Sequence, residues 1–386
     1  MSEVSTPEKI GEQNKKLILD YVRKYGPVSR ADIKRSLGMS FPSVSANVKD
    51  LLDMKYLLEG GEGDNSLGRK STLLAFNATR GYVIGVDLGR SQIRIIVANL
   101  EGREIVSLKD ESTIVKEGRK ITERLTELVC ETVKRAQIQS EKVKCICIGV
   151  PGVIDERSDE VLIAPFIQPI NWKKITAALN HYFDVPVLIE NSVNYGAIGE
   201  KWRGAAKGYK DIVYINYGVG VGAAIIINGE LHRGINGASG EIGFMVPERV
   251  NLRNAFSEQG ALETIISGNQ LNEIMGLEGI DTNIETVIRQ SAKGEKASEL
   301  LVREIVEYIG MMLINITSVF NEELIVIGGG LGDYLGGLFI PEWKKMLKNH
   351  VPFVPEVVTS KLHSHANVLG AVAAGLRHIN EYIKED

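Results

Sequence analysis

Near its start the chain alternates apolar and polar positions with the spacing of short amphipathic helices. The pattern predicts a first helix over residues 14–25, which Gly26-Pro27 ends. Ser29 and Ser40 are the expected N-caps of two further short helices, joined at Gly38. Two short helices with a glycine between them are typical of a helix-turn-helix.

Two short apolar runs around a glycine-rich stretch follow these helices and predict a β-hairpin wing. In a winged helix-turn-helix the second helix of the motif lies in the major groove of DNA. The residues expected to contact DNA are Ser43, Ser45, Ala46, Asn47 and Lys49 on this helix, and Arg69 and Lys70 on the wing. The alternative is a small three-helix domain that docks on the rest of the chain or on another protein.

The pattern changes at residue 81, where strand-like runs begin to alternate with helical ones. The first strand, from Tyr82, ends in Asp87-Leu-Gly89 and is followed by a second strand from Ile93. A strand, a tight turn and a second strand, with an aspartate at the turn, are typical of actin-like ATPases. The sequence therefore predicts an α/β fold for this larger part.

Composition and charge set limits on the function. The 386 residues are 44% hydrophobic and 24% charged, as in soluble proteins of two or three domains. The net charge of −4 excludes a uniformly basic protein, but residues 1–76 carry +2 and the remainder −6, the sign expected for a DNA-binding head. With three cysteines, no long apolar run and no apolar leader, we expect a cytoplasmic protein without disulfides.

Several motifs occur in a fixed order along the chain. They are Ser66-Leu-Gly68-Arg69-Lys70, Asp87 to Ile93, Pro151-Gly152, Gly199-Glu200-x-x-x-Gly204, Gly218-Val-Gly220-Val-Gly222, Gly234 to Gly243, and Ile327 to Gly330. Together they resemble the ROK family (repressors, open reading frames and kinases) over essentially the whole chain. With a winged head in front, the order resembles the family's sugar-responsive repressors rather than its sugar kinases, which lack such a head.

The resemblance implies a domain organisation. We expect a winged helix over residues 1–76, a linker over 77–80, and a two-lobed actin-like (ribonuclease H-like) sugar-kinase core. Its N-terminal lobe would span 81–194 and its C-terminal lobe 195–386. The last helix, expected after Gly370-Ala371, would pack back on the first lobe.

The resemblance also implies two groups of site residues in the cleft between the lobes. Sugar hydroxyls would be held by Gly152, Asn191, Glu241, Phe244 and Glu263. A vestigial phosphate site would be formed by Asp87, Gly89, Gly218, Gly220, Gly222 and Gly329. Phe244 stands where the family has a histidine, and its ring would either stack on a sugar or fill the space.

The residues required for phosphoryl transfer are altered. The family's catalytic base lies in a Glu-Asn-Asp-x-Asn run, which here reads Glu190-Asn191-Ser192-Val193-Asn194, so a serine that does not ionise near neutral pH stands at the base position. Glu190 is an alternative base, but it lies two residues back, roughly 6–7 Å along the strand. Arg90 replaces a glycine of the first phosphate loop and Val219 a threonine of the second.

No metal ion or other cofactor is expected. The family's zinc ligands are missing, because Phe244 and Ala261 occupy two of those positions and no cysteine lies between them. Cys145-x-Cys147 and His363-x-His365 are isolated pairs, too few for a tetrahedral zinc site. Whether a nucleotide still binds is left open.

The function expected from this combination is a DNA-binding transcriptional regulator, a repressor of carbohydrate genes, whose kinase-like core senses a sugar without phosphorylating it. An ATP-dependent sugar kinase of the glucokinase or N-acetylglucosamine kinase type is one alternative, and a regulator that senses only a partner protein is another. The expected partners are a double-stranded DNA operator, a small sugar and a second copy of the chain, since operators have two-fold symmetry.

Overall fold

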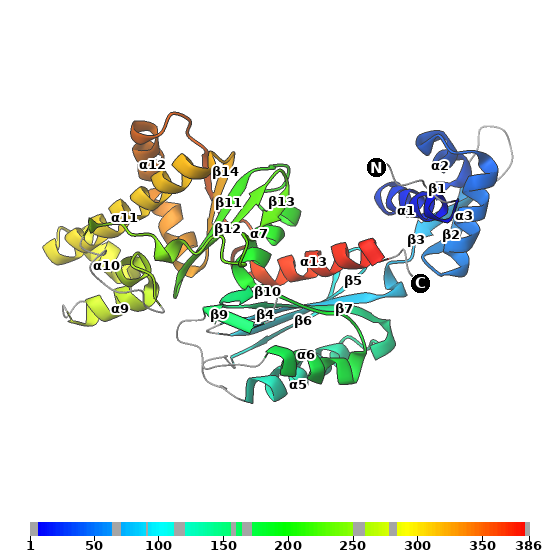
Figure 1. Ribbon diagram of the computed structural model, residues 1–386, viewed down its shortest axis with the longest axis horizontal. Helices are drawn as coiled ribbons and strands as arrows, with labels where there is room; N and C mark the ends of the chain where they lie inside the picture. Colours follow the sequence, from blue (N-terminus) through cyan, green and yellow to red (C-terminus); the bar gives the residue numbers. More distant parts are fainter. Residues whose placement is uncertain are drawn as a thin grey trace.

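The computed structural model describes residues 7–63, 71–89, 92–111, 120–155, 160–163, 172–249, 259–277 and 284–382. A small N-terminal head is set apart from a two-lobed core (Figure 1). The head consists of α1 (Pro7–Tyr25), β1 (Val28–Ser29), α2 (Arg30–Leu37), α3 (Phe41–Asp53), β2 (Leu57–Gly63) and β3 (Ser71–Phe76). Its strands form one sheet in the order β1-β3-β2, which is the predicted winged helix-turn-helix.

The local signals for the helices of the head are confirmed. The Ser29 side chain accepts a hydrogen bond from the Asp32 backbone, and Asp32 accepts one from Ser29 in return, which completes a capping box. Gly38 ends α2 in the left-handed conformation with φ 66°, and Ser40 caps α3. The first helix begins at Pro7 rather than at residue 14, so that prediction was too short.

The core contains two lobes. The first comprises β4 (Tyr82–Leu88), β5 (Ile93–Asn99), β6 (Glu104–Asp110), α5 (Ile121–Arg135), η3 (Ser140–Lys142), β7 (Val143–Val150), β8 (Val153–Asp155), β9 (Glu160–Ile163), α6 (Trp172–Phe183) and β10 (Val187–Asn191). After α7 (Ser192–Arg203), the second comprises β11 (Ile212–Tyr217), β12 (Val221–Ile227), β13 (Glu230–His232), η4 (Ile242–Phe244), α8 (Glu263–Ile266), α9 (Gly268–Leu277), α10 (Ile284–Ser291), α11 (Lys296–Phe320), β14 (Leu324–Gly328), α12 (Gly330–His350) and β15 (Glu356–Thr359). The chain ends with η6 (His363–His365) and α13 (Ala366–Tyr382).

Both lobes are built on the same sheet topology. The first sheet has the order β10-β7-β4-β5-β6 and the second β13-β12-β11-β14-β15. In each, three strands that follow one another in the chain pair antiparallel, and two later strands add in parallel beside the first of them. This duplication is the actin-like core that the sequence predicted.

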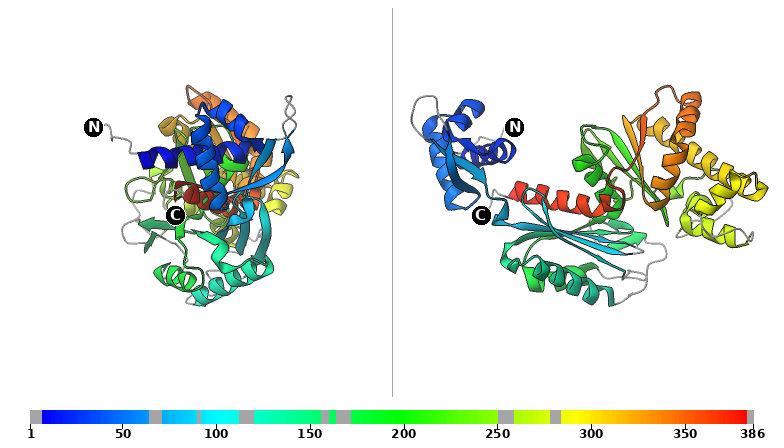
Figure 2. Two further views of the ribbon diagram at one scale, coloured as in Figure 1. Left: turned by 90° about the vertical axis from the view of Figure 1, so that its right-hand side faces the viewer. Right: turned by 180° about the vertical axis from the view of Figure 1, so that it is seen from behind.

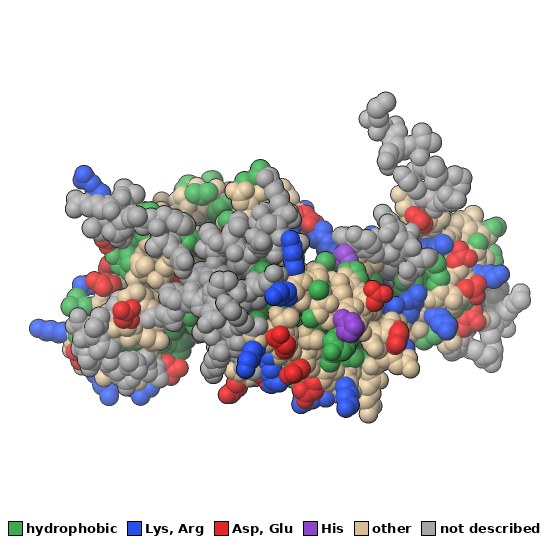
Figure 3. All heavy atoms as spheres, turned by 60° about the horizontal axis from the view of Figure 1, so that its bottom comes forward, with side chains coloured by type: hydrophobic (Ala, Val, Ile, Leu, Met, Phe, Trp, Pro, Cys, Tyr) green, Lys and Arg blue, Asp and Glu red, His purple; other side chains and the backbone are tan. Residues whose placement is uncertain are grey.

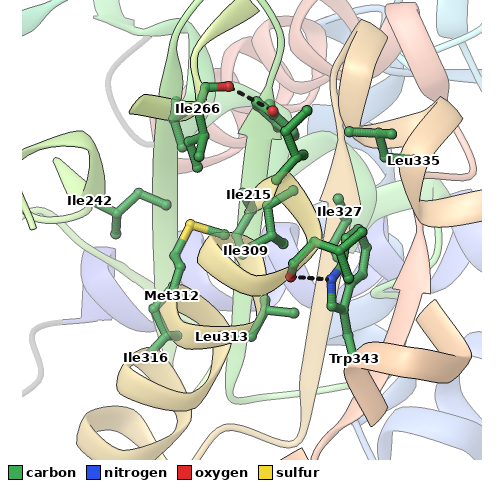
Figure 4. Close-up of a cluster of buried hydrophobic side chains, with 14 of the residues drawn as sticks. Ile215, Ile242, Ile266, Ile309, Met312, Leu313, Ile316, Ile327, Leu335 and Trp343 are labelled. Carbon is green, nitrogen blue, oxygen red and sulfur yellow. Dashed lines mark hydrogen bonds between the residues drawn. The ribbon is translucent and has the colours of Figure 1, made fainter. Parts of the chain in front are cut away.

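Helices cover both faces of each sheet. In the first lobe α5 and α6 lie on one face, while α7 and α13 lie on the other, toward the second lobe (Figures 1 and 2). The second lobe packs α11 and α12 on its outer face in the largest apolar cluster that the described residues form, part of which Figure 4 shows. There Trp343 is fully buried and its indole N–H donates to the Val306 carbonyl at 3.0 Å.

The helices α7 and α13 cross between the two sheets and touch at glycines. A β-carbon at position 370 would lie 1.6 Å from the Tyr195 carbonyl oxygen, and one at Gly199 would lie 2.2 Å from the Ala366 carbonyl oxygen. Gly370 therefore lies inside α13, which begins at Ala366, and the expectation that the last helix starts after Gly370 was wrong. The glycine serves close helix contact rather than a turn. The helix packs on β4, β5 and β7 of the first lobe.

The head is joined to the core by a short, packed segment rather than by an extended linker. Residues 78–80 form the 3₁₀ helix η1, and the Arg80 guanidinium lies 4.0 Å from the centre of the Tyr56 ring in the head. The position proposed for the division between the lobes, Asn194, lies inside α7.

Charges on the core surface are mixed. On the face shown in Figure 3, Lys and Arg side chains are interspersed with Asp and Glu. Among the described residues, no helix is both long and apolar enough to cross a membrane.

Candidate functional site

A cavity of about 720 Å³ lies between the two lobes of the core and takes its lining from both. Residues of the first lobe enter from the ends of β4 and β7, and residues of the second lobe from the β11–β12 turn and from the start of α12. His363 and Ser364 of η6 and Asn367 at the N-terminal end of α13 also line it. Ligands of open α/β sheets bind at such strand ends.

All five residues expected at a sugar line this one cavity: Gly152, Asn191, Glu241, Phe244 and Glu263. Asn191 is the N-cap of α7, and its Oδ1 accepts a hydrogen bond from Val193 N at 2.8 Å, which fixes the side chain. Glu263 is the first residue of α8 and is 6% exposed. Its Oε1 accepts a hydrogen bond from Val221 N at 3.4 Å. A buried carboxylate and a fixed amide offer the paired acceptors and donors that sugar hydroxyls require.

The six residues expected at a phosphate line the same cavity: Asp87, Gly89, Gly218, Gly220, Gly222 and Gly329. Gly329 precedes α12 with φ 86°, and a β-carbon there would lie 2.5 Å from the Tyr217 carbonyl oxygen. Gly218 N donates to Gly220 O at 2.9 Å across the β11–β12 turn. These glycines thus make tight turns at the cavity wall. Arg90, which replaces a glycine of the first phosphate loop, lies outside the described residues.

Asp87 is a buried acid at the wall of the cavity. It is 5% exposed at the end of β4, and burial raises the pKa of its carboxyl to about 6. Asn367 Nδ2 lies 3.4 Å from its Oδ1, and Arg94 Nη1 lies 4.0 Å from its Oδ2. Both groups favour the charged form and only partly offset the effect of burial on the pKa.

This buried acid predicts a pH dependence of stability. Because the pKa of Asp87 is higher in the folded than in the unfolded chain, the folded state holds the proton more tightly between about pH 4 and pH 6, and stability is lost as pH rises through this range. Asp87→Asn removes this loss. From pH 4 to pH 7 we expect the difference in unfolding free energy between variant and wild type to shift by about 2 kcal/mol in favour of the variant. Denaturant melts at several pH values measure it, and a difference independent of pH would contradict the assignment.

Ser192 occupies the position expected for the catalytic base, and Glu190 is the alternative base two residues earlier. Ser192 begins α7 and lines the cavity, with 8% exposure. Glu190 is not among the described residues that line the cavity, and both its oxygens are engaged. Its Oε2 accepts from Arg233 Nε at 2.7 Å, and its Oε1 accepts from Asn191 N at 2.8 Å and Asn194 Nδ2 at 2.9 Å. Glu190 therefore ties the two lobes together through Arg233, and its carboxylate is engaged in this conformation.

The two segments that would have carried zinc ligands are in direct contact. Leu262 N donates to the Met245 carbonyl at 3.1 Å, and a β-carbon at Gly260 would lie 2.1 Å from the Gly243 carbonyl oxygen. Within the described part of the chain, no three His, Cys, Asp or Glu side chains come together as a metal site. Cys145 and Cys147 are buried neighbours on β7 with their sulfur atoms 3.7 Å apart.

In the head, one residue expected to contact DNA is turned inward. Asn47 is 8% exposed, and its Nδ2 donates to the Ser43 carbonyl at 2.8 Å. The expectation that Asn47 reads a base was therefore wrong for this conformation, because the amide bonds the preceding turn of its own helix. Ser43 and Ser45 are partly exposed. Ala46 and Lys49 are exposed, while Arg69 and Lys70 lie outside the described residues.

Several cavity residues were not found from the sequence. Arg94 on β5 and His363, Ser364 and Asn367 beside or on α13 line the cavity. His363 Nδ1 also lies 3.2 Å from Asp333 Oδ2. None of these belongs to a glycine-rich motif, and His363 is far from the other motifs in sequence. Only the packing of α13 between the lobes brings it there.

Comparisons with known proteins agree with this geometry. The model of the ROK family matches residues 83–377. A xylose repressor of Caldicellulosiruptor bescii is 30% identical over 381 residues, which cover 93% of this chain and 94% of that protein. The chain belongs to the ROK family.

Within the ROK family, the regulators resemble this chain over more of its length than the kinases do. The DNA-binding transcriptional dual regulator NagC of Escherichia coli is 23% identical over 85% of this chain and 83% of its own. The crystal structure of a ROK family transcriptional regulator, a homologue of the E. coli MLC protein, covers 98% of this chain and is itself covered completely, with a TM-score of 0.77 and 21% identity. The ROK hexokinase of Thermus thermophilus covers 78% of this chain and 99% of its own, with a TM-score of 0.65 and 23% identity.

Proposed function

We propose that this protein is a sequence-specific DNA-binding transcriptional regulator, a repressor of carbohydrate genes, whose DNA affinity responds to a sugar held between the lobes of its core. One observation carries the proposal. A capped helix-turn-helix head is packed onto a kinase-like core whose cavity is lined by the carboxylate and amide side chains expected at a sugar, with Ser192 at the position expected for the catalytic base. Such a core is suited to bind a sugar and not to activate its hydroxyl.

The alternative of a sugar kinase has less support from this cavity. Loss of a positioned base costs about 10²- to 10⁴-fold in rate, and Glu190, the alternative base that the sequence offered, is held by Arg233 and Asn194. We expect the purified protein to transfer no phosphoryl group from ATP to hexoses or pentoses in a coupled assay. Turnover at rates typical of kinases would overturn the regulator proposal in favour of the enzyme.

Selection of bound duplexes from a random DNA pool at near-physiological salt tests DNA binding directly. We expect enrichment of a palindrome, since we propose that the protein acts as a homodimer on a two-fold operator. A sugar panel is then screened for compounds that change the affinity for this operator. Retention of DNA without any motif, or no retention with or without sugars, would contradict the proposal.

The helix α13 connects the cavity to the head. Asn367, near its N-terminal end, lines the cavity and hydrogen-bonds Asp87. Near its C-terminal end, Leu376 and Ile379 pack against the apolar core of the head, and Asn380 Oδ1 accepts from Arg23 of α1 at 3.0 Å. The 17 residues span about 25 Å, and Figures 1 and 2 show this helix (red) extending from between the lobes to the head.

We infer that a sugar in the cavity changes DNA affinity through α13. A change in the position of the lobes moves the helix, because α7 and α13 are interlocked at Gly199 and Gly370. The shift then reaches α1 through Arg23, and in a dimer it alters the spacing of the two heads.

The Arg23–Asn380 hydrogen bond provides a test of this route. Asn380→Ala removes the acceptor, whereas Asn380→Asp keeps an oxygen for the Arg23 guanidinium. In Asn380→Ala we expect sugar affinity to stay within about twofold of wild type, while the factor by which sugar changes operator affinity falls at least about threefold. Asn380→Asp should respond like wild type. Titrations of operator with and without the sugar measure both, and an unchanged factor in Asn380→Ala would contradict the role of this contact.

A further inference from the structure

The recognition helix α3 exposes apolar side chains where it begins. Phe41, its first residue, is 51% exposed, and Pro42 and Ala46 are also exposed. The helix start is firmly held, because Ser40 Oγ accepts from Ser43 N at 3.3 Å and Ser40 O accepts from Val44 N at 3.0 Å. An aromatic ring at a fixed helix start, half in solvent, is an unpartnered apolar group.

Two polar side chains of α3 are already engaged within the head. The Asn47 amide bonds the helix backbone, and Asp50 pairs with Lys15 of α1 at 3.2 Å. The buried stripe consists of Val44, Val48 and Leu51. The first two turns therefore present Phe41, Pro42 and Ala46 outward, with Ser43 and Ser45 partly exposed beside them.

The place of these residues in the motif specifies their occupant. In a helix-turn-helix, residues in the N-terminal half of the second helix meet the base edges of the major groove. Among these edges the apolar group is the C5-methyl of thymine; guanine, cytosine and adenine offer hydrogen-bond donors and acceptors. The apolar core of the head takes Val44, Val48 and Leu51 from α3 and leaves Phe41, which precedes them, half exposed.

We propose that Phe41 and Ala46 read thymine methyl groups in the major groove of the operator. The proposal rests on the proposed DNA-binding function and deepens it by naming the chemical group recognised. Phe41 supplies the larger contact, and Ala46, five residues or about 7.5 Å further along α3, supplies a second contact at another base pair. The sequence read by this helix is therefore set largely by methyl positions rather than by bidentate hydrogen bonds.

Replacing thymine by deoxyuridine tests this directly, because only the methyl group is lost and base pairing remains. The probe is the palindrome selected from the random pool, with one thymine at a time replaced in each half-site. For the wild-type protein we expect one or two positions per half-site at which binding weakens about fourfold, the effect of one buried methyl group. If every thymine is replaceable without loss, the proposal is overturned, while an enriched palindrome would still uphold the DNA-binding function.

A variant assigns the effect to its residue. Phe41→Ala should bind the unmodified operator more weakly and should lose its sensitivity to deoxyuridine at the position that Phe41 reads, while sensitivity at the Ala46 position remains. Leu17→Ala is the matched control, since Leu17 on α1 is 50% exposed in the same head. It should keep the wild-type pattern at every thymine. Full sensitivity to deoxyuridine in Phe41→Ala would overturn the assignment to Phe41, and a thermal melt confirms that each variant is folded.

Discussion

Alanine in place of Gly370 is expected to lower the free energy of unfolding by about 3 kcal/mol or more, at the upper end of the range for overpacking. The added β-carbon would lie 1.6 Å from the Tyr195 carbonyl oxygen and 3.0 Å from Gly199 N, both on α7. Because these neighbours are backbone atoms and not flexible side chains, α7 and α13 would have to separate. Chemical denaturation of the purified protein measures the loss.

Gly337→Ala is the control for this substitution. Gly337 lies inside α12, is exposed, and has nothing within 4 Å of a β-carbon. Alanine is the better helix former by roughly 0.5–1 kcal/mol, so this variant should be slightly more stable than wild type. Equal effects of the two substitutions would show that α7 and α13 lie further apart at Gly370 than these distances indicate.

Glutamine in place of Glu200 is expected to cost about 3 kcal/mol of unfolding free energy, since a fully buried acceptor of several hydrogen bonds would be replaced by a group with donors of its own. Oε1 of Glu200 accepts from Ser360 Oγ at 2.5 Å and from Leu362 N at 2.9 Å, and Oε2 accepts from Ala205 N at 2.6 Å. An amide nitrogen at either position would face N–H or O–H donors. Denaturant melts at pH 7 measure the effect.

The surface residue Glu323 offers the matched control. Its Oε2 also accepts two backbone N–H groups, those of Lys210 at 2.7 Å and Asp211 at 3.0 Å, but the side chain is exposed. Water replaces the lost hydrogen bonds at this position, so Glu323→Gln should destabilise the protein far less than Glu200→Gln. If Glu200→Gln were as mild as the control, Glu200 would not be the residue that holds the 360–362 segment against α7.

The features of this protein that depend on neighbouring residues along the chain were readable from its sequence. The capping box of Ser29 and Asp32, the left-handed Gly38 and the N-cap Ser40 all form within a few residues, so the helix-turn-helix follows from local chemistry. The cavity residues known from ordered motifs were also found, because motifs at strand ends and tight turns keep their place when the sheets form.

Features that depend on contacts between distant segments were decided by the tertiary structure alone. Gly370 looks like a helix boundary in sequence, yet it lies within α13. It is at the point where α7 approaches too closely for a side chain.

Asn47 looks solvent-facing on a helical projection, yet its amide bonds its own helix in a buried position. Glu190 looks like a substitute base until Arg233, from the other lobe, pairs with it. The sequence by itself determined which residues are able to cap, turn and bind. The environment of each side chain, and hence its pKa, exposure and partners, was settled only when the chain folded and its segments packed together.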